Sequence, residues 1–170
     1  MDRYEEGRPS VSGTLERAIR LREAGELEEA RAVLLELLEE NPEDPAVNYQ
    51  CAWVHDRMGR EREAIPLYER AISRGLAGGD LEGATLSLGS SYRAVGDHAK
   101  AAEVLRGGVE RFPQNRAMQV FLAMALHNVG EQERAMEILL RNLAETSSDP
   151  DISAYRKALS FYADRLDEAT

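Results

Sequence analysis

RAVGDHAKA, residues 93–101, is the most informative segment of the chain, because three other segments repeat its pattern of glycine and alanine. REAGELEEA (22–30), DRMGREREA (56–64) and HNVGEQERA (127–135) each place an alanine five residues after a glycine. The four glycines are spaced by 34, 37 and 34 residues and are Gly25, Gly59, Gly96 and Gly130. A nearly fixed period of this length is typical of a protein built from stacked repeats.

Each of these glycines separates two helical patterns. Leu88, Tyr92 and Val95 form an apolar stripe at helical spacing before Gly96, and a second stripe begins at Ala101. Glycine after a helix adopts the left-handed cap conformation without steric cost. The unit is therefore a helix A, a tight turn and a helix B. One such pair cannot bury its apolar face alone, so neighbouring pairs must stack, and the sequence predicts an all-α fold.

The third unit resembles the tetratricopeptide repeat signature most fully, through Leu88, Gly89, Tyr92, Gly96, Ala101 and Pro113. The stretches NYQCAWVHD, FPQNRAMQVFLAMAL and NLAETSSDPDISAYRKALSFYADRLDE are similar to the bacterial group 5 tetratricopeptide repeat family. This resemblance implies a right-handed superhelical array of four helix-turn-helix repeats followed by a C-terminal capping helix.

The register of the repeat sets the expected organisation of the chain. We expect a disordered tail over residues 1–10 and a single repeat domain over residues 11–168. The repeats are expected at 11–44, 45–78, 82–115 and 116–149, and the capping helix at 150–166, with Ser148 or Asp149 near its N-cap. The glycine-rich residues 75–83 predict a loose joint before a long helix that starts after Asp80. Gly107 and Gly108 lie inside a helix B, where either a close neighbour or local weakness would explain them.

Composition narrows the class of partner. The 170 residues carry a net charge of -10, which disfavours nucleic acid and anionic membranes because phosphates would be repelled. A single cysteine cannot form an internal disulfide, and no apolar run approaches the ~20 residues that a bilayer requires. We expect a cytoplasmic protein without a cofactor, whose partner is a protein or peptide that is neutral to basic and partly apolar.

Cys51 and His55 are four residues apart on one helix, so a metal pair or a nucleophile with its base is geometrically open to them. In the repeat frame they occupy the seventh and eleventh places, which point between helices. No four-ligand set closes around them, because His98 and His127 fall elsewhere in the frame. Packing is the favoured interpretation, since a buried free cysteine behaves as a small hydrophobe. An enzyme or metal protein that uses Cys51 and His55 is the disfavoured alternative.

The resemblance also implies a concave groove lined by the fifth, ninth, twelfth and thirteenth places of each helix A. Exposed apolar and aromatic side chains with arginines at their edge commonly mark contact sites. The predicted partner-binding residues are Tyr49, Trp53, Arg57, Leu86, Ser90, Arg93, Val120, Met124, His127 and Asn128.

Three functions are compatible with this surface to different degrees. The favoured one is a non-enzymatic scaffold that binds a helix or peptide in the groove. Leu15, Tyr49, Leu86 and Val120 stand at the fifth place, so the carboxylate clamp of tetratricopeptide co-chaperones is absent. The alternatives are a groove filled by its own side chains, and a homodimer formed through the groove or the N-terminal edge. No phosphate loop, HExxH motif or acid-base pair supports an enzyme.

Overall fold

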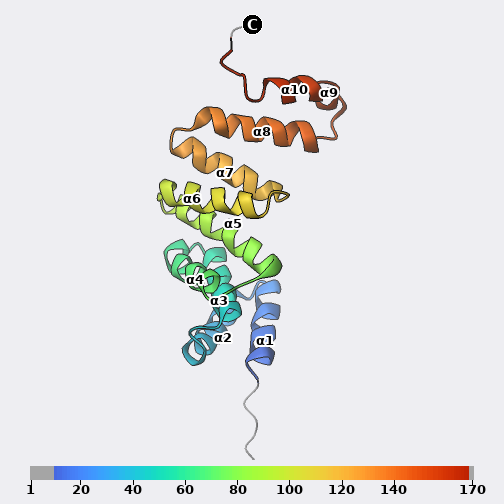
Figure 1. Cartoon of the computed structure of the whole chain (residues 1–170). Coiled ribbons are helices and arrows are strands. Elements are labelled where there is room, and N and C mark those ends of the chain that lie inside the picture. The colour runs from blue at the N-terminus through green and yellow to red at the C-terminus, as the bar shows by residue number, and fades with distance from the viewer. Residues whose placement is uncertain (1–9, 169–170) are drawn as a thin grey trace, which may run out of the picture. The chain divides into compact units, whose positions relative to one another are not determined.

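The computed structural model describes residues 10–168, and this part of the chain contains ten helices and no strand. The all-α fold predicted from the sequence is confirmed. The chain divides into two compact units, of which the first ends at Ala84 and the second begins at Thr85. The helices, labelled in Figure 1, are α1 (Val11–Glu23), α2 (Leu27–Glu40), α3 (Pro45–Arg57), α4 (Glu61–Ser73), α5 (Gly78–Ala94), α6 (His98–Arg111), α7 (Arg116–Asn128), α8 (Gln132–Thr146), α9 (Pro150–Ala154) and α10 (Arg156–Tyr162).

Side-chain caps and glycine turns set the helix boundaries. Asp44 caps α3 by accepting hydrogen bonds from the backbone N–H groups of Ala46 and Val47, and Asn115 caps α7 in the same way. The four turn glycines that define the period all adopt positive φ, between 70° and 90°. An L side chain would be strained there, so the turn between helix A and helix B depends on glycine.

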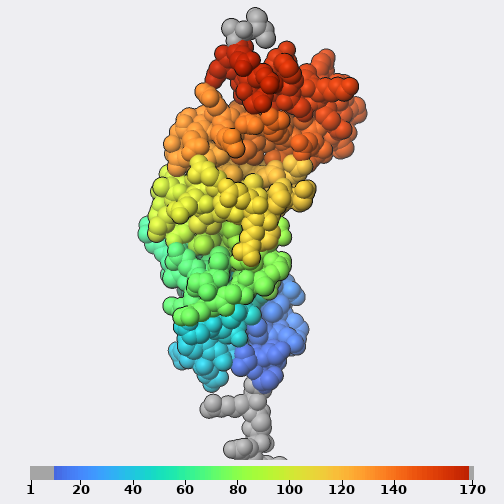
Figure 2. All heavy atoms as spheres, in the orientation of Figure 1, coloured from blue at the N-terminus to red at the C-terminus, as the bar shows by residue number. Residues whose placement is uncertain are grey.

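Within each unit, most of the contacts join helices that follow one another in sequence, and inside a unit neighbouring colours in Figure 2 lie side by side. In the first unit α2 contacts α1 and α3, and α3 contacts α4; in the second, α7 contacts α6 and α8. The eighth place of each helix A and the twentieth of the repeat are small and buried in every repeat. These residues are Ala18, Ala52, Gly89 and Ala123 on the helices A, and Ala30, Ala64, Ala101 and Ala135 on the helices B.

The three extra residues between the second and third repeats lengthen a helix. The sequence predicted a loose glycine joint and a helix after Asp80, but α5 already begins at Gly78 and runs for 17 residues. Only Gly75 and Gly78 keep positive φ in this stretch. Gly83 is helical, and a Cβ there would lie 2.7 Å from the Tyr49 hydroxyl, so glycine permits a close approach within the first unit.

The C-terminal segment caps the second unit with two short helices, which differs from the single helix expected over residues 150–166. Asp149 is the N-cap of α9, and it is one of the two residues that the sequence analysis predicted near this cap. The helix breaks at Tyr155, whose φ of -102° and ψ of 10° leave the helical region. The break turns the chain so that Ala163, 1% exposed, reaches the interior, while Tyr155 and Tyr162 stay exposed. The tail predicted for residues 1–10 lies outside the described residues except for Ser10, which caps α1.

Helical glycines in the second unit differ in what surrounds them. A Cβ on Gly89 would lie 2.4 Å from Cγ of Leu105, a side chain that is itself fully buried. A Cβ on Gly108 would lie 2.5 Å from Sδ of Met118, whereas one on Gly107 would meet nothing within 4 Å. Gly89 and Gly108 therefore allow close packing, and Gly107 only weakens its helix.

We expect Gly89→Ala to lower the free energy of unfolding by about 1 kcal/mol, because overpacking against Leu105 outweighs the gain in helix propensity. The matched control Gly107→Ala should raise it by up to ~1 kcal/mol, because only the propensity term remains. Urea denaturation with equal m values measures both. Equal stability of the two variants would show that Leu105 does not pack against Gly89.

Candidate functional site

In the first unit, Trp53 is held in place by an arginine from the preceding repeat. The Arg22 guanidinium stacks on the indole at 3.6 Å from the ring centroid, and its Nη1 donates to Oε1 of Gln50 at 2.6 Å. The Arg22 side chain is only 9% exposed, while its ion-pair partner Glu23 remains largely in solvent. A cation over an indole in a partly desolvated site contributes on the order of 1–2 kcal/mol. Trp53 is thus half-buried and oriented, with one face covered by Arg22.

Tyr49 supports Trp53 from the side. Their ring centroids lie 5.7 Å apart at a tilted angle, and Tyr49 also contacts the buried ring of Tyr68 at 6.2 Å. Burial raises the pKa of the Tyr49 phenol, the nearby Asp80 raises it further, and Arg22 lowers it. Tyr49 is 5% exposed, so it is a supporting core residue rather than the open contact residue predicted from sequence. Arg57, at the end of α3, is exposed.

In the second unit, the predicted residues lie on the faces of α5 and α7. Nε of Arg93 donates to Oδ1 of Asn128 at 2.9 Å, so these two residues join the third and fourth repeats. His127 is exposed. The remaining four predicted residues are half-buried and are Leu86, Ser90, Val120 and Met124. The predicted set therefore falls into a first-unit group around Trp53 and a second-unit group around the Arg93–Asn128 pair.

Cys51 lies in the hydrophobic core of the first unit, as its repeat position predicted. It is 0% exposed and packs with Ala18, Ala30, Leu34 and Val54. Burial raises the pKa of the Cys51 thiol to about 11, and the charge of Arg31 opposes this rise. A thiol that is protonated and sealed from solvent is a poor nucleophile and a poor metal ligand.

His55 is buried as well, and its ring nitrogens lack hydrogen-bond partners in the described part of the chain. It is 6% exposed. Burial lowers the pKa of His55, the neighbouring Arg31 and Arg60 lower it further, and Glu63 opposes them. Cys51 and His55 are therefore both buried, and neither is placed to act on a substrate or a metal ion. Among residues 10–168, no cluster of three or more His, Cys, Asp or Glu side chains is arranged to hold a metal ion.

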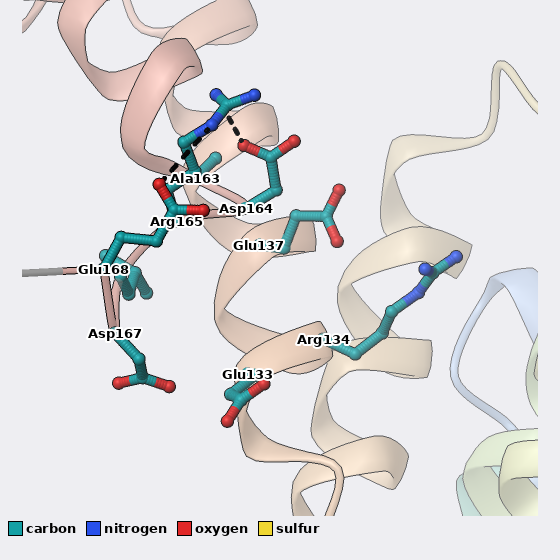
Figure 3. A pocket seen from close by; sticks show the side chains of 9 residues that line it. Glu133, Arg134, Glu137, Ala163, Asp164, Arg165, Asp167 and Glu168 are labelled. Atoms are coloured by element: carbon teal, nitrogen blue, oxygen red, sulfur yellow. Dashed lines mark ion pairs between the residues drawn. The ribbon is translucent and has the colours of Figure 1, made fainter.

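An acidic pocket of about 360 Å³ lies between α8 and the segment after α10 (Figure 3). Glu133 and Glu137 come from α8, and Asp167 comes from the C-terminal segment. Hydrogen bonding to Asp167 and repulsion between the two carboxylates raise the pKa of Glu133. Arg165 pairs with Asp164 at 3.1 Å within the same segment. Carboxylates outnumber arginines in its lining, so the pocket disfavours an anionic ligand.

These features define a helical repeat protein whose helices A present aromatic, apolar and arginine side chains. The family model described as tetratricopeptide repeat, group 5, matches residues 45–166, and a second tetratricopeptide repeat model matches residues 11–36. The chain belongs to the tetratricopeptide repeat family, as its sequence motifs indicated. Proteins of this family serve generally as non-enzymatic scaffolds for protein interactions.

Solved structures share the fold at low sequence identity. MamA is 17% identical with a TM-score of 0.71, over 88% of this chain and 76% of that one. MamA from Desulfovibrio magneticus RS-1 is 19% identical with a TM-score of 0.73, over 82% and 78% of the two chains. YrrB, a TPR protein described as having an unusual peptide-binding site, is 20% identical with a TM-score of 0.72, over 92% and 79%. None of the helices in residues 10–168 is long and apolar enough to cross a membrane.

Gln50 is the residue of the Trp53 group that sequence reasoning missed, and the covering role of Arg22 was missed with it. Arg22 stands at the twelfth place of the first repeat, where the frame predicted an open side chain. Its contact with Gln50 and Trp53 depends on the distance between two consecutive helices A, which repeat spacing alone does not give.

Cys51 should be unreactive toward a thiol reagent in the native protein at pH 8, because at a pKa of about 11 only ~0.1% of the group is thiolate and the sulfur is buried. Urea should restore stoichiometric reaction. Absorbance of the released thiol chromophore measures both states. The raised pKa also predicts that the free energy of unfolding falls above about pH 9. At such pH the thiol loses its proton in the unfolded chain but keeps it in the folded protein. Rapid native labelling would contradict the burial of Cys51.

His55→Phe should raise the free energy of unfolding by about 1 kcal/mol at pH 7, because it removes two buried nitrogens without partners. This gain in the free energy of unfolding should grow as pH falls toward ~5. In the wild-type chain the imidazole takes up a proton at its ordinary pKa when unfolded, but its lowered pKa disfavours protonation in the folded state. His55→Gln is the control, because it removes the titration but keeps a buried polar group. Urea unfolding across this pH range separates the two effects, and a pH-independent difference for His55→Phe would disprove the titration.

Proposed function

We propose that the protein is a non-enzymatic interaction module that binds a helix or an extended peptide of a partner on the helix-A faces that carry the predicted partner-binding residues. One observation carries the proposal. Trp53, a residue type that often dominates binding energy, is fixed on the surface by Arg22 rather than buried in the core. An aromatic side chain that is already ordered loses little conformational entropy when a partner contacts it.

The second unit carries an apolar surface of its own on its helices A. Met124, Val120 and Leu86 are half-buried, so each has apolar area left for a partner to cover. The Arg93–Asn128 hydrogen bond joins their helices and leaves polar groups at the edge, where they suit a peptide backbone. The peptide-binding site in the name of YrrB supports a peptide ligand for this fold. The proposed function requires neither catalysis nor a cofactor. The cytoplasmic location stays a prediction from the sequence.

A second candidate function is homodimerisation through the N-terminal edge. A cavity of about 330 Å³ opens between α1 and α2, and Val11, Val33 and Leu37 supply its apolar lining. Glu36 and Arg17 stand at its border and would suit a two-fold contact in which each copy offers both charges. Sedimentation of the purified chain distinguishes this candidate from a monomeric binder.

Trp53→Ala and Met124→Glu should each weaken partner binding by at least about tenfold while the helical circular dichroism signal persists, since neither side chain is fully buried. The partner is first identified by affinity capture with the wild-type chain and mass spectrometry, and its affinity is then measured by calorimetry. Met136→Glu is the matched control, because Met136 is 46% exposed on the helix B of the same repeat.

The two variants test the two units separately. Loss of helix in Trp53→Ala would show that Trp53 is a core residue, and equal loss of binding in Met136→Glu would remove the distinction between helix A and helix B. A concentration-dependent dimer that survives Trp53→Ala but dissociates on Val33→Glu would favour the N-terminal edge instead.

A further inference from the structure

The last helix of the second unit carries large apolar side chains on its solvent side. α10 packs on α8, and the half-buried or buried side chains of Leu159, Ser160 and Ala163 face inward. In Figure 2, α9 and α10 form the outer layer of this unit. Four large apolar side chains in and beside α10 remain between 46% and 68% exposed. We call these four side chains the cap face, and they are Tyr155, Phe161, Tyr162 and Leu166.

The exposure of the cap face is unusual for the end of a repeat array. A terminal repeat normally presents a polar outer face, which keeps the array soluble and ends the stacking. The first repeat follows this rule. Val11 is the one strongly exposed large apolar residue of α1 and α2, and the seventh place, buried in the other three repeats, is the exposed Arg17. The cap face breaks the rule, and a surface of this kind commonly marks an interaction site.

The two central rings of the cap face are held in position by their neighbours. The ring centroids of Phe161 and Tyr162 lie 5.2 Å apart, edge to face. The Arg165 guanidinium lies 4.7 Å from the centroid of the Phe161 ring, and its Nη1 donates to the Phe161 carbonyl at 2.7 Å. Aromatic side chains that are already ordered lose little conformational entropy when a partner covers them.

α10 is basic at its start. Its sequence RKALSFY contains two cations and no carboxylate. Arg156 donates to the carbonyl of Ser147 at 3.4 Å. Lys157 is exposed and has neither a hydrogen bond nor an ion pair among residues 10–168. The start of α10 therefore carries a positive charge that the chain itself does not pair.

The acidic pocket beyond the end of α10 has the opposite surplus (Figure 3). Three of its five carboxylates pair with Arg141 or Arg165. No ion pair joins Glu133 or Asp167 to a cation within the part of the chain that the structure describes. Hydrogen bonding between these two groups and their mutual repulsion raise the pKa of Glu133. A cation that arrives from outside would relieve this repulsion.

A second copy of the chain supplies both missing charges at once. When two copies of α10 pack antiparallel about a two-fold axis, the start of one lies opposite the end of the other. If the axis passes between Phe161 and Tyr162, residue 157 of one copy lies opposite residue 166 of the other, because both are equally far from that point. Lys157 then meets Asp167, and the four rings meet at the axis. Both halves of the contact are present on one chain, which favours a second copy over an unrelated partner.

The area of the cap face is that of the centre of an ordinary dimer interface. Complete burial of an aromatic side chain removes roughly 150–250 Å² from water, so the three partly exposed rings and Leu166 offer roughly 300–500 Å². A standard interface buries about 800 Å² on each partner, of which rather more than half is apolar. The cap face can supply this apolar part, and Lys157 and the acidic pocket can supply the polar rim.

We propose that the protein forms a two-fold dimer through the cap face, in which Phe161 and Tyr162 of the two copies pack together and Lys157 of each copy binds Asp167 and Glu133 of the other. This contact is distinct from the N-terminal edge, and it does not depend on partner binding at the helix-A faces. A dimer of this kind would carry two sets of helix-A faces.

Sedimentation velocity of the full chain over a concentration series tests the proposal. The wild-type chain should pass from monomer to dimer at micromolar concentration, within the range of interfaces of this size. Phe161→Glu should weaken the dimer at least about a hundredfold, because each dimer contains the change twice. Val129→Glu is the matched control and should dimerise as the wild type does, because Val129 is 38% exposed in the same unit outside the cap face. Circular dichroism verifies that both variants keep their helices.

Two charge reversals test the antiparallel orientation. Lys157→Glu and Asp167→Lys should each weaken the dimer when alone, because like charges then face each other across the axis. An equimolar mixture of the two variants should restore a dimer with one copy of each, since every reversed charge then meets an opposite one.

Four results would each overturn the proposal. They are a wild-type chain that stays monomeric through the micromolar range, a dimer that Phe161→Glu does not weaken, a dimer that dissociates on Val33→Glu instead, and charge reversals whose mixture forms no more dimer than either variant alone.

Discussion

Close contact between the two helices of each repeat is the constraint on which the other features depend. Small residues at the eighth and twentieth places, such as Ala18 and Ala30, let the backbones approach because they add almost no side chain between them. Once these positions face each other, the rotation of helix A is fixed. Cys51, one residue before Ala52, then points into the core, and Trp53, one residue after it, emerges beside Arg22. The chemistry of each side chain follows from this rotation.

Consecutive helices A are joined by polar contacts that also shape the candidate surface. In the first unit Arg22 bonds Gln50 and covers one face of Trp53, and in the second Arg93 bonds Asn128. Such contacts order the side chains and use part of their binding capacity. A partner bound at these faces, as we propose, would therefore meet a preformed edge of Trp53 and half-buried apolar side chains rather than an open aromatic face. Its affinity would depend more on shape complementarity than on the area that it buries.

The sequence predicted whatever depends on period and residue size. The turn glycines, the starts of α1, α3 and α7, and the burial of Cys51 and His55 all follow from counting places in the repeat. It could not predict features that depend on distances between elements. The break at Tyr155 and the additional helical turn that begins at Gly78 are settled by packing against neighbours. The hydrogen bond that Asn142 of α8 donates to Gln119 of α7 is of the same kind, because it depends on how these two helices lie against each other.

The acidic composition constrains the partner less than the net charge of -10 suggests, because the carboxylates are unevenly placed. α2, a helix B, carries five glutamates against the single Arg31, whereas α7, a helix A, carries Arg116 and no carboxylate. Charges beyond a Debye length of about 8 Å are largely screened at physiological salt. A partner on the helix-A face of the first unit would therefore respond mainly to Arg57 and nearby side chains, and one on the second unit mainly to Arg93. Local charge at these faces favours a neutral apolar segment over a basic one.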